Sequence, residues 1–507
     1  MASVVIGIDS GTQSTKALVV DAKTGNVLGE SSEAYGLIEG LPSGAKEQHP
    51  SVWVEALKNS VTKALKKSKC KPSDVVGIGV SGQQHGFVPL DKNGAVIRPA
   101  KLWCDTSTVE ECEILTDAIG GKAKAIRETG NAFVPGFTAP KILWLKRHEP
   151  KNFKKLASVL LPHDYLNFWL TGEKVMEFGD ASGTAFFDVR KRKFSEKVMG
   201  LIDSKLSSKI PNLISSDQPA GFLQQSAAEA LGLNKGVIVS AGGGDNMMGA
   251  IGTGNTSPGV VTASFGTSGT IYACSGKPVV DPQGEIAAFC DSTNHWLPLL
   301  CTMNVTVATE MVRKRNNWDH SQLEKKVKKV PVGCDGLVLV PYLDGERTPN
   351  VPDGTGVLFG VNGKTFNPAY EARAAMEGVT LGMNYGLNRL RKLKLTPTQI
   401  RATGGGAKSR TWLQMMADVF NTEVVTLKIS EGAAYGAALQ ALWVWKNQSG
   451  NHVSISEITN KFVKVNNRER FQPREEQAGI YQDLQKLQDG LSKSLRKDFT
   501  KHRNLAS

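Results

Sequence analysis

Residues 4–20, VVIGIDSGTQSTKALVV, give the strongest indication of how this chain folds. Two apolar runs, residues 4–8 and 17–20, flank a hydroxyl-rich turn that begins at Asp9. Short apolar runs separated by turn residues are typical of paired β-strands. Gly11 lets the backbone turn tightly, and the hydroxyl and N–H groups after it suit phosphate oxygens. The stretch predicts a strand, a phosphate-binding turn and a second strand, although an ordinary hairpin would give the same pattern.

The rest of the chain predicts an α/β protein with two similar halves. Apolar residues at i, i+4 spacing indicate a helix over residues 50–67, and the apolar run 75–80 indicates a buried strand. Strands and helices alternate to about residue 245, which is typical of an α/β fold. A second cycle of strand, turn and strand over residues 260–273 repeats the arrangement at the N-terminus.

The length of the chain predicts its division into domains. At 507 residues it exceeds what one hydrophobic core usually organises. We therefore expect two domains, residues 1–250 and 251–507, with a cleft between them.

Composition favours a cytoplasmic protein without a membrane or nucleic-acid partner. No run of 18 apolar residues occurs, and the segment from Met1 becomes acidic too early for a signal peptide. The seven cysteines are odd in number and contain no CxxC pair, which favours a reduced compartment. The net charge of +13 is concentrated in mixed-sign, helix-like stretches such as 313–329 and 446–503. These lack the aromatic residues of a single-strand binder, so we interpret them as solvated faces.

Three further glycine-rich stretches are suited to a nucleotide and a reacting hydroxyl. Residues 242–246, GGGDN, hold one carboxylate at a predicted strand end, where it would act as a base or cap the next helix. Residues 265–269, FGTSG, form a second phosphate-type turn. Residues 403–409, TGGGAKS, offer a flat backbone against which a base or ribose can lie, or simply a glycine-rich helix entry.

Spacing argues against two other nucleotide-binding motifs. A Walker A loop requires GxxxxGK[ST], and the nearest candidate, residues 363–365, has Leu358 where the first glycine belongs. Residues 77–82 match GxGxxG but continue as QQHGFV, which predicts a bent strand instead of the helix that a dinucleotide site needs.

Taken in order, five motifs resemble the FGGY family of carbohydrate kinases: DSGT at 9–12, GQQHG at 82–86, GGGDN at 242–246, FGTSG at 265–269 and TGGGAKS at 403–409. Residues 136–148 also look like the N-terminal signature of that family. The resemblance covers about residues 4–445 and is greatest toward the members that phosphorylate D-xylulose. It implies two ribonuclease-H-like domains of the actin and hexokinase type, which close over ATP, Mg²⁺ and the sugar.

The resemblance also implies roles for individual residues. Asp245 would accept the proton of the sugar hydroxyl, Asp9 would assist metal and phosphate, and both would hold Mg²⁺ through water. The expected sugar-binding residues are Gln84, His85, Trp103, Asp105, Asp245 and Asn246. The expected ATP-binding residues are Gly11, Thr12, Gln13, Ser14, Lys16, Gly266, Thr267, Gly404, Gly405, Gly406 and Ser409.

Two departures from the family pattern concern the sugar. Gln84 stands where methionine is common, and Ser107 stands where arginine is frequent. A kinase for another ketopentose or a polyol is therefore the main alternative. An actin-like ATPase switch and a sugar-responsive regulator are alternatives of other classes, which GQQHG and Asp245 disfavour. A homodimer is one possible assembly.

Overall fold

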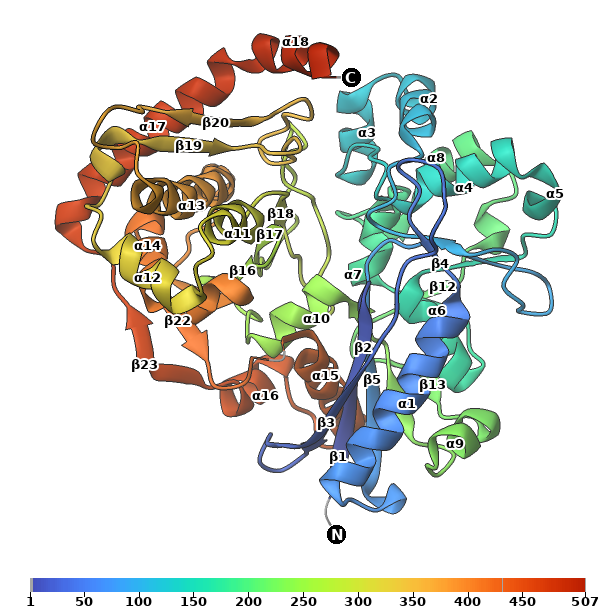
Figure 1. The fold of residues 1–507 in the computed structure, drawn as a ribbon. Coiled ribbons are helices and arrows are strands. Elements are labelled where there is room, and N and C mark those ends of the chain that lie inside the picture. The colour runs from blue at the N-terminus through green and yellow to red at the C-terminus, as the bar shows by residue number, and fades with distance from the viewer. Residues whose placement is uncertain (1–2, 431, 507) are drawn as a thin grey trace.

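Two β-sheets, one from each half of the chain, organise the molecule (Figure 1). The computed structural model describes residues 3–430 and 432–506; Met1 and Ala2, in the segment considered for a signal peptide, lie outside them. The first sheet has the strand order β13 (Pro219–Phe222), β14 (Ile238–Ser240), β5 (Val75–Gly82), β1 (Val4–Ser10), β2 (Ser14–Asp21), β3 (Val27–Ala34), and β15 (Gly243–Gly244) also pairs with β5. The second has the order β18 (Leu299–Thr302), β17 (Gly269–Ala273), β16 (Val260–Phe265), β21 (Gln399–Thr403), β22 (Glu423–Leu427), β23 (Val465–Phe471).

The two sheets share one topology. In the first, β2 lies between β1 and β3 and is antiparallel to both, and β5 lies parallel to β1 on its other side. In the second, β16, β17 and β18 form the same antiparallel set, and β21 lies parallel to β16. The expected α/β fold and the expected repetition of the arrangement at residues 4–20 are confirmed. The hydroxyl-rich turn is only three residues long, because β1 and β2 extend beyond the apolar runs.

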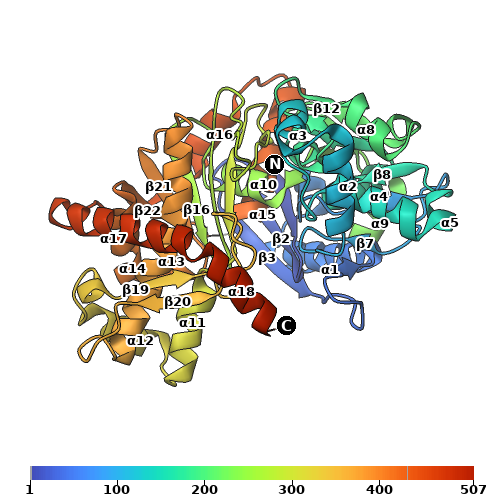
Figure 2. The same ribbon diagram turned by 90° about the horizontal axis from the view of Figure 1, so that it is seen from above.

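Helices cover both sheets and fill the space around them (Figures 1 and 2). The helices of the first half are α1 (Pro50–Ser68), α2 (Val109–Ile119), α3 (Lys122–Thr129), α4 (Thr138–His148), α5 (Pro150–Phe153), α6 (Pro162–Thr171), α7 (Phe178–Ala181), α8 (Glu196–Ile202), α9 (Gln225–Leu231) and α10 (Asp245–Gly252). Those of the second half are α11 (Thr306–Arg315), α12 (His320–Lys328), α13 (Pro368–Lys392), α14 (Arg410–Phe420), α15 (Gly432–Gln448), α16 (Ile455–Phe462), α17 (Glu475–Ser494) and α18 (Arg496–Ala506). Short 3₁₀ turns are η1 (Pro72–Asp74), η2 (Ser182–Thr184), η3 (Ser207–Lys209), η4 (Cys334–Gly336) and η5 (Gly405–Lys408).

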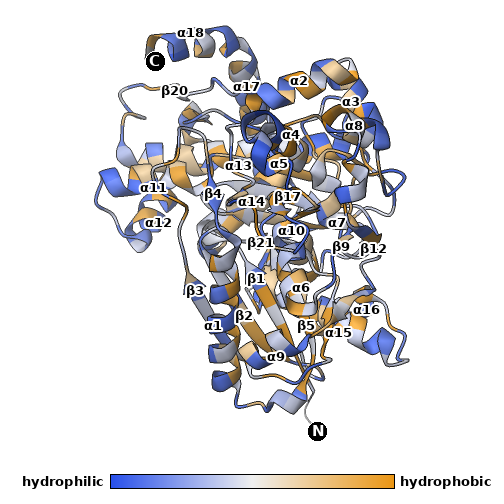
Figure 3. Ribbon diagram, turned by 90° about the vertical axis from the view of Figure 1, so that its right-hand side faces the viewer, coloured by the Kyte–Doolittle hydropathy of each residue, from blue (hydrophilic) through white to orange (hydrophobic). Residues whose placement is uncertain are grey.

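Short strand pairs connect the remaining segments. They are β4 (Glu47–Gln48) with β7 (Ala100–Lys101), β6 (Val88–Leu90) with β8 (Ser158–Leu160), β9 (Val175–Glu177) with β12 (Asn212–Ile214), β10 (Phe187–Asp188) with β11 (Lys193–Phe194), and β19 (Val338–Pro341) with β20 (Gly356–Phe359). The apolar strands β1, β2 and β5 are orange in Figure 3, whereas the exposed side of α1 is largely blue. None of the helices in the described ranges has the length and apolar character that crossing a membrane requires.

Helix α15 belongs to the second half in sequence but packs against the first sheet and against α10. Alternate residues of β1 face different cores: Ile6 and Ile8 pack toward α1, whereas Val5 packs with the alanines of α15. Glycines allow the close approach, since a Cβ at Gly436 would overlap the carbonyl oxygen of Met248 in α10. In Figure 1, α10 and α15 lie between the two halves.

One feature of the C-terminal segment differs from the expectation. Residues 446–503 were expected to be helical, but Val465–Phe471 is β23, the edge strand of the second sheet. Its charged side chains are compatible with an edge position, and Arg470 pairs with Glu423 of β22 at 2.8 Å. The predicted domain limit at residue 250 falls within α10, and the division into residues 1–250 and 251–507 stays a prediction.

Candidate active site

The predicted first phosphate loop, residues 9–16, lines a cavity of about 560 Å³ at the end of β1. The N–H of Gly11 donates to the carbonyl of Ser14 at 3.0 Å and closes the turn. All the predicted residues of this loop are in the lining, together with Trp103: Asp9, Gly11, Thr12, Gln13, Ser14 and Lys16. Trp103 Nε1 donates to the Thr12 hydroxyl at 2.9 Å. The predicted contact of Trp103 with sugar stays a prediction.

Two buried glutamines that sequence reasoning missed hold this loop in place. Gln48 Nε2 donates to the Thr12 carbonyl at 2.7 Å, and Thr12 Oγ1 donates to Gln83 Oε1 at 3.3 Å. Gln83 Nε2 in turn donates to Gln48 Oε1 at 2.9 Å. These contacts join segments more than 30 residues apart, so no local pattern indicates them.

The opposite wall of the cavity comes from the second half of the chain. Ser430, Gly432, Ala433 and Ala434, at the beginning of α15, complete the lining. The first turn of a helix carries free N–H groups and favours anions. A run of small residues after β22 was the available signal for this second wall.

The carboxylates of Asp9 and Asp245 come from elements on either side of β5. Asp9 of β1 and Gly243 of β15 are both register partners of Ser81. Ser81 Oγ donates to Asp9 Oδ1 at 2.8 Å, and Asp245 is the first residue of α10. Burial is the largest cause of the raised pKa of Asp245, which is about 7, and the charges of Asp9 and Asp180 also raise it. A carboxyl with that pKa is suited to accept a proton near neutral pH.

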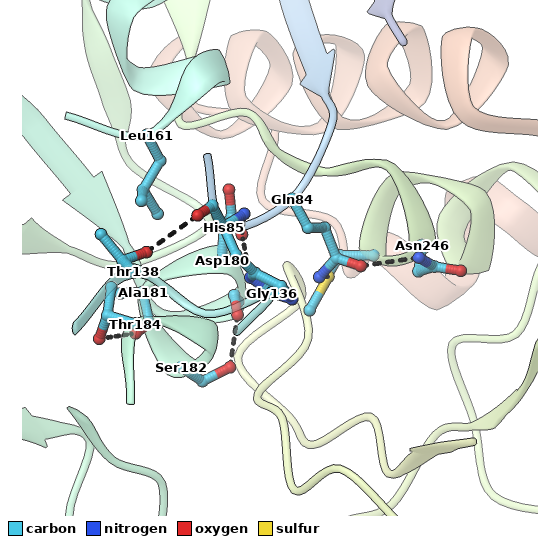
Figure 4. Close-up of polar contacts among 12 residues, drawn as sticks. Gln84, His85, Gly136, Thr138, Leu161, Asp180, Ala181, Ser182, Thr184 and Asn246 are labelled. Atoms are coloured by element: carbon cyan, nitrogen blue, oxygen red, sulfur yellow. Dashed lines mark hydrogen bonds and ion pairs between the residues drawn. The ribbon is translucent and has the colours of Figure 1, made fainter. Parts of the chain in front are cut away.

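Gln84 and Asn246 form a hydrogen-bonded pair beside Asp245. Asn246 Nδ2 donates to Gln84 Oε1 at 2.7 Å (Figure 4). It also donates to Asp245 Oδ1 at 2.9 Å. Gln84 Nε2 lies 2.9 Å from the sulfur of Met247. The amide of Gln84 therefore contacts side chains of α10.

Asp105, predicted to bind sugar, is fully buried among other polar groups. Its carboxylate accepts hydrogen bonds from the Lys46 N–H at 2.8 Å, from Ser107 Oγ at 2.6 Å and from Lys101 Nζ at 3.1 Å. Ser107, which replaces the arginine common in the family, thus contacts Asp105 directly. The structure places Asp105 in a polar network behind the loop, and direct contact with sugar stays a prediction.

The predicted second phosphate loop, residues 266–268, lies beside Gly404 and the two glycines that follow it, at one end of the second sheet. Gly266 and Thr267 form the turn between β16 and β17, and their carbonyls accept the N–H groups of Thr306 and Val305 at 3.0 Å. Gly404 has a φ of +83° and approaches so closely that a Cβ would lie 2.7 Å from the carbonyl carbon of Phe265.

The residues that follow Gly404 are in a helical entry. Gly405 and Gly406 are in η5, and the Ser409 hydroxyl caps α14 by accepting the Trp412 N–H at 3.3 Å. These predicted ATP-binding residues are outside the lining of the 560 Å³ cavity. Their contact with ATP stays a prediction.

The two halves have the same sheet topology, and in each half a phosphate-type turn joins the first two strands of the sheet. This paired arrangement is the architecture of the actin-like phosphotransferases. A model of the N-terminal domain of the FGGY family of carbohydrate kinases matches residues 4–252, and a model of the C-terminal domain matches residues 261–445. The chain therefore belongs to the FGGY family of carbohydrate kinases. Membership makes it an ATP-dependent kinase of a carbohydrate.

Similar proteins have been described in several bacteria. A xylulose kinase of Haemophilus influenzae is 42% identical over 484 residues, which cover 94% of this chain and 97% of the relative. A xylulose kinase of Bacillus subtilis is 37% identical and covers 91% of each chain. The solved structure of xylulose kinase from Rhodospirillum rubrum is 28% identical, covers 98% of this chain and 100% of that one, and superposes with a TM-score of 0.89.

Proposed function

We propose that this enzyme transfers the γ-phosphoryl group of ATP to O5 of D-xylulose, giving ADP and D-xylulose 5-phosphate. The observation that carries the proposal is the position of Asp245, which neighbours Asp9 of the phosphate loop on one side and Asn246 and Gln84 on the other. The relatives named xylulose kinase, similar over more than nine-tenths of the chain, support the choice of sugar.

In this mechanism Asp245 removes the proton from the attacking hydroxyl as the new P–O bond forms and the bond to ADP breaks. Phosphoryl transfer needs positioning and charge neutralisation more than covalent chemistry. The N–H groups of the first loop and of the α15 start would face phosphate oxygens, while Gly404, Gly405 and Gly406 would lie along the adenosine. Mg²⁺, when bound, would neutralise phosphate charge, and Asp9 and Asp245 would hold it through water. Two nearby carboxylates, with Asp9 raising the pKa of Asp245, fit a hydrated divalent cation.

A coupled ADP-release assay across pentuloses and polyols tests the proposal. We expect D-xylulose to give the highest kcat/KM and to require Mg²⁺. Faster turnover of another ketopentose or a polyol would favour the alternative substrate. ATP hydrolysis that no sugar accelerates would favour a switch. We further propose a cytoplasmic location, which fractionation of cells can test, and a homodimer, which sedimentation of the purified protein can test.

Replacing Gln84 by methionine tests the sugar specificity of the site. The thioether accepts hydrogen bonds only weakly, so Asn246 would lose its 2.7 Å partner. We expect Gln84→Met to keep D-xylulose phosphorylation but to change its kcat/KM relative to other pentuloses by about five- to tenfold, the scale of one neutral hydrogen bond. A lower melting temperature with an unchanged sugar ranking would mean that Gln84 only supports the fold.

A further inference from the structure

Four buried side chains, those of His85, Asp180, His163 and Asp164, lie in a row. His85 Nδ1 is 3.0 Å from Asp180 Oδ1, Asp180 Oδ2 is 3.1 Å from His163 Nδ1, and His163 Nε2 is 2.9 Å from Asp164 Oδ1. The side chain of His85 keeps 9% of its surface exposed, and the other three keep at most 1%. The first and last contacts have the length of a hydrogen bond but do not meet its angular criteria.

The backbone of His85 is held in an unusual conformation by groups around it. Its φ is +60°, a left-handed value that a residue with a side chain keeps only when its surroundings compensate. Its N–H donates to Asp180 Oδ1 at 3.1 Å, and its carbonyl accepts from Thr138 Oγ1 at 3.1 Å (Figure 4). The same carbonyl also accepts from Lys141 Nζ at 3.0 Å. Thr138 and Lys141 lie within the family signature at residues 136–148, so the signature supports His85.

The ring of His85 is confined as well. A Cβ at Gly183 would overlap its Nδ1 and Cε1 atoms, so only glycine leaves room for the ring. The rings of Phe137 and Phe289 pack against it with centroids 5.0 and 5.2 Å away. No residue within 3–430 and 432–506 is hydrogen-bonded to Nε2 of His85. Because Nδ1 faces Asp180, Nε2 is the ring nitrogen that is available to a ligand.

The charges along the row favour a neutral His85 beside an ionised Asp180. Burial would lower the pKa of His163, but Asp164 and Asp180 raise it well above its usual value. Burial would raise the pKa of Asp180, but His163 and His85 lower it to about 2. Burial lowers the pKa of His85. A neutral imidazole carries one N–H, and a carboxylate at Nδ1 selects the tautomer in which Nδ1 is the donor and Nε2 the acceptor.

We propose that Asp180 is a positioning residue for sugar binding, which holds His85 so that Nε2 accepts a hydrogen bond from a hydroxyl of the sugar. This inference rests on the proposed function and on the sugar-binding role that the family resemblance implies for His85. His163 keeps Asp180 ionised because its positive charge lies between the carboxylates of Asp164 and Asp180. Burying these two carboxylates without a cation would cost free energy. A site of this kind penalises an analogue that lacks the donating hydroxyl, because Nε2 then stays unpaired.

A double-mutant cycle separates positioning from general support of the fold. We expect Asp180→Asn to raise the KM for the sugar about tenfold or more, with the KM for ATP unchanged. In a His85→Ala background the same substitution should change the sugar KM less than twofold, because its effect passes through His85. Equal factors in both backgrounds would overturn the proposal. The sugar used is the one that the wild-type enzyme turns over fastest, so failure of the D-xylulose assignment leaves this test intact.

A matched control and a measurement on the unchanged protein complete the test. Asp281 is also fully buried but pairs with Arg389, so Asp281→Asn should lower the melting temperature without changing the sugar KM. In the wild-type enzyme labelled with [¹⁵N]histidine, ¹⁵N spectra should contain the signals of a neutral histidine with Nδ1 protonated and Nε2 bare, and these signals should be absent from His85→Gln. The Nε2 signal should shift when sugar is added. A protonated Nε2 at His85 would overturn the proposal even if Asp180→Asn does not fold.

Discussion

Asp245→Asn is expected to lower sugar-dependent kcat by about 10²- to 10⁴-fold, the usual value of a general base. Asparagine keeps the shape of the side chain but accepts no proton, so the attacking hydroxyl would have no base. ATP binding, measured by calorimetry, should change little, because the phosphate loop is formed by β1, β2 and α15. A variant that keeps more than a tenth of kcat would show that another group takes the proton.

The same carboxyl predicts how activity and stability depend on pH. The base must be ionised, and with its pKa at about 7 we expect kcat/KM to fall as the pH drops below about 7. The folded state binds this proton more tightly than the unfolded chain does. The free energy of unfolding therefore falls as the pH rises from the usual pKa of an aspartate to about 7, and above about pH 7 the whole loss is present. Asp245→Asn removes this cost, so it should raise the melting temperature more at pH 8 than at pH 5. A difference that is equal at both pH values would contradict the raised pKa.

Gly436→Ala is expected to destabilise the protein by about 3 kcal/mol, at the upper end of overpacking effects. The added Cβ would overlap the carbonyl oxygen of Met248, and its other close neighbours, such as the nitrogen of Gly252, are also backbone atoms that cannot rotate away. The two helices would have to separate at their crossing. Urea denaturation and the melting temperature measure the loss.

Gly479→Ala is the matched control for this substitution. Gly479 is also in a helix, α17, but a Cβ there meets nothing within 4 Å. Because alanine is the better helix former, this variant should be as stable as the wild type or more stable by up to about 1 kcal/mol. Equal losses from the two substitutions would mean that the crossing of α10 and α15 tolerates a larger separation.

Local features were predictable from the sequence, and contacts between distant segments were not. The strand–turn–strand at residues 4–20 and helix α1 follow from periodicity, because their signals lie within one element. Asp245 could be proposed as the base because a lone carboxylate after three glycines fits the family motif. The contact of Trp103 with Thr12 has no local pattern, since it joins residues 91 positions apart.

Composition misled where tertiary pairing decides the structure. The charges of residues 465–471 resemble those of the neighbouring helices, yet hydrogen bonding to β22 makes the segment a strand. The contacts of Asp105 with Lys101 and Ser107 in the interior were not predicted either, and its contact with sugar stays a prediction. Asp180 carries no motif that would distinguish it from a surface aspartate, and only the fold brings it to His85.

The position of α15 has a consequence for biosynthesis. Strands β1 and β5 are complete by residue 82, but the helix that covers one face of their sheet ends at residue 448. At about 5–20 residues per second, a ribosome needs roughly 20–70 s to make the intervening chain. During that time the face carrying Val5 and Leu18 has no covering helix, so nascent chains are exposed to aggregation and to chaperones. The half that is synthesised first therefore completes its folding only after the last sixth of the chain has begun to emerge.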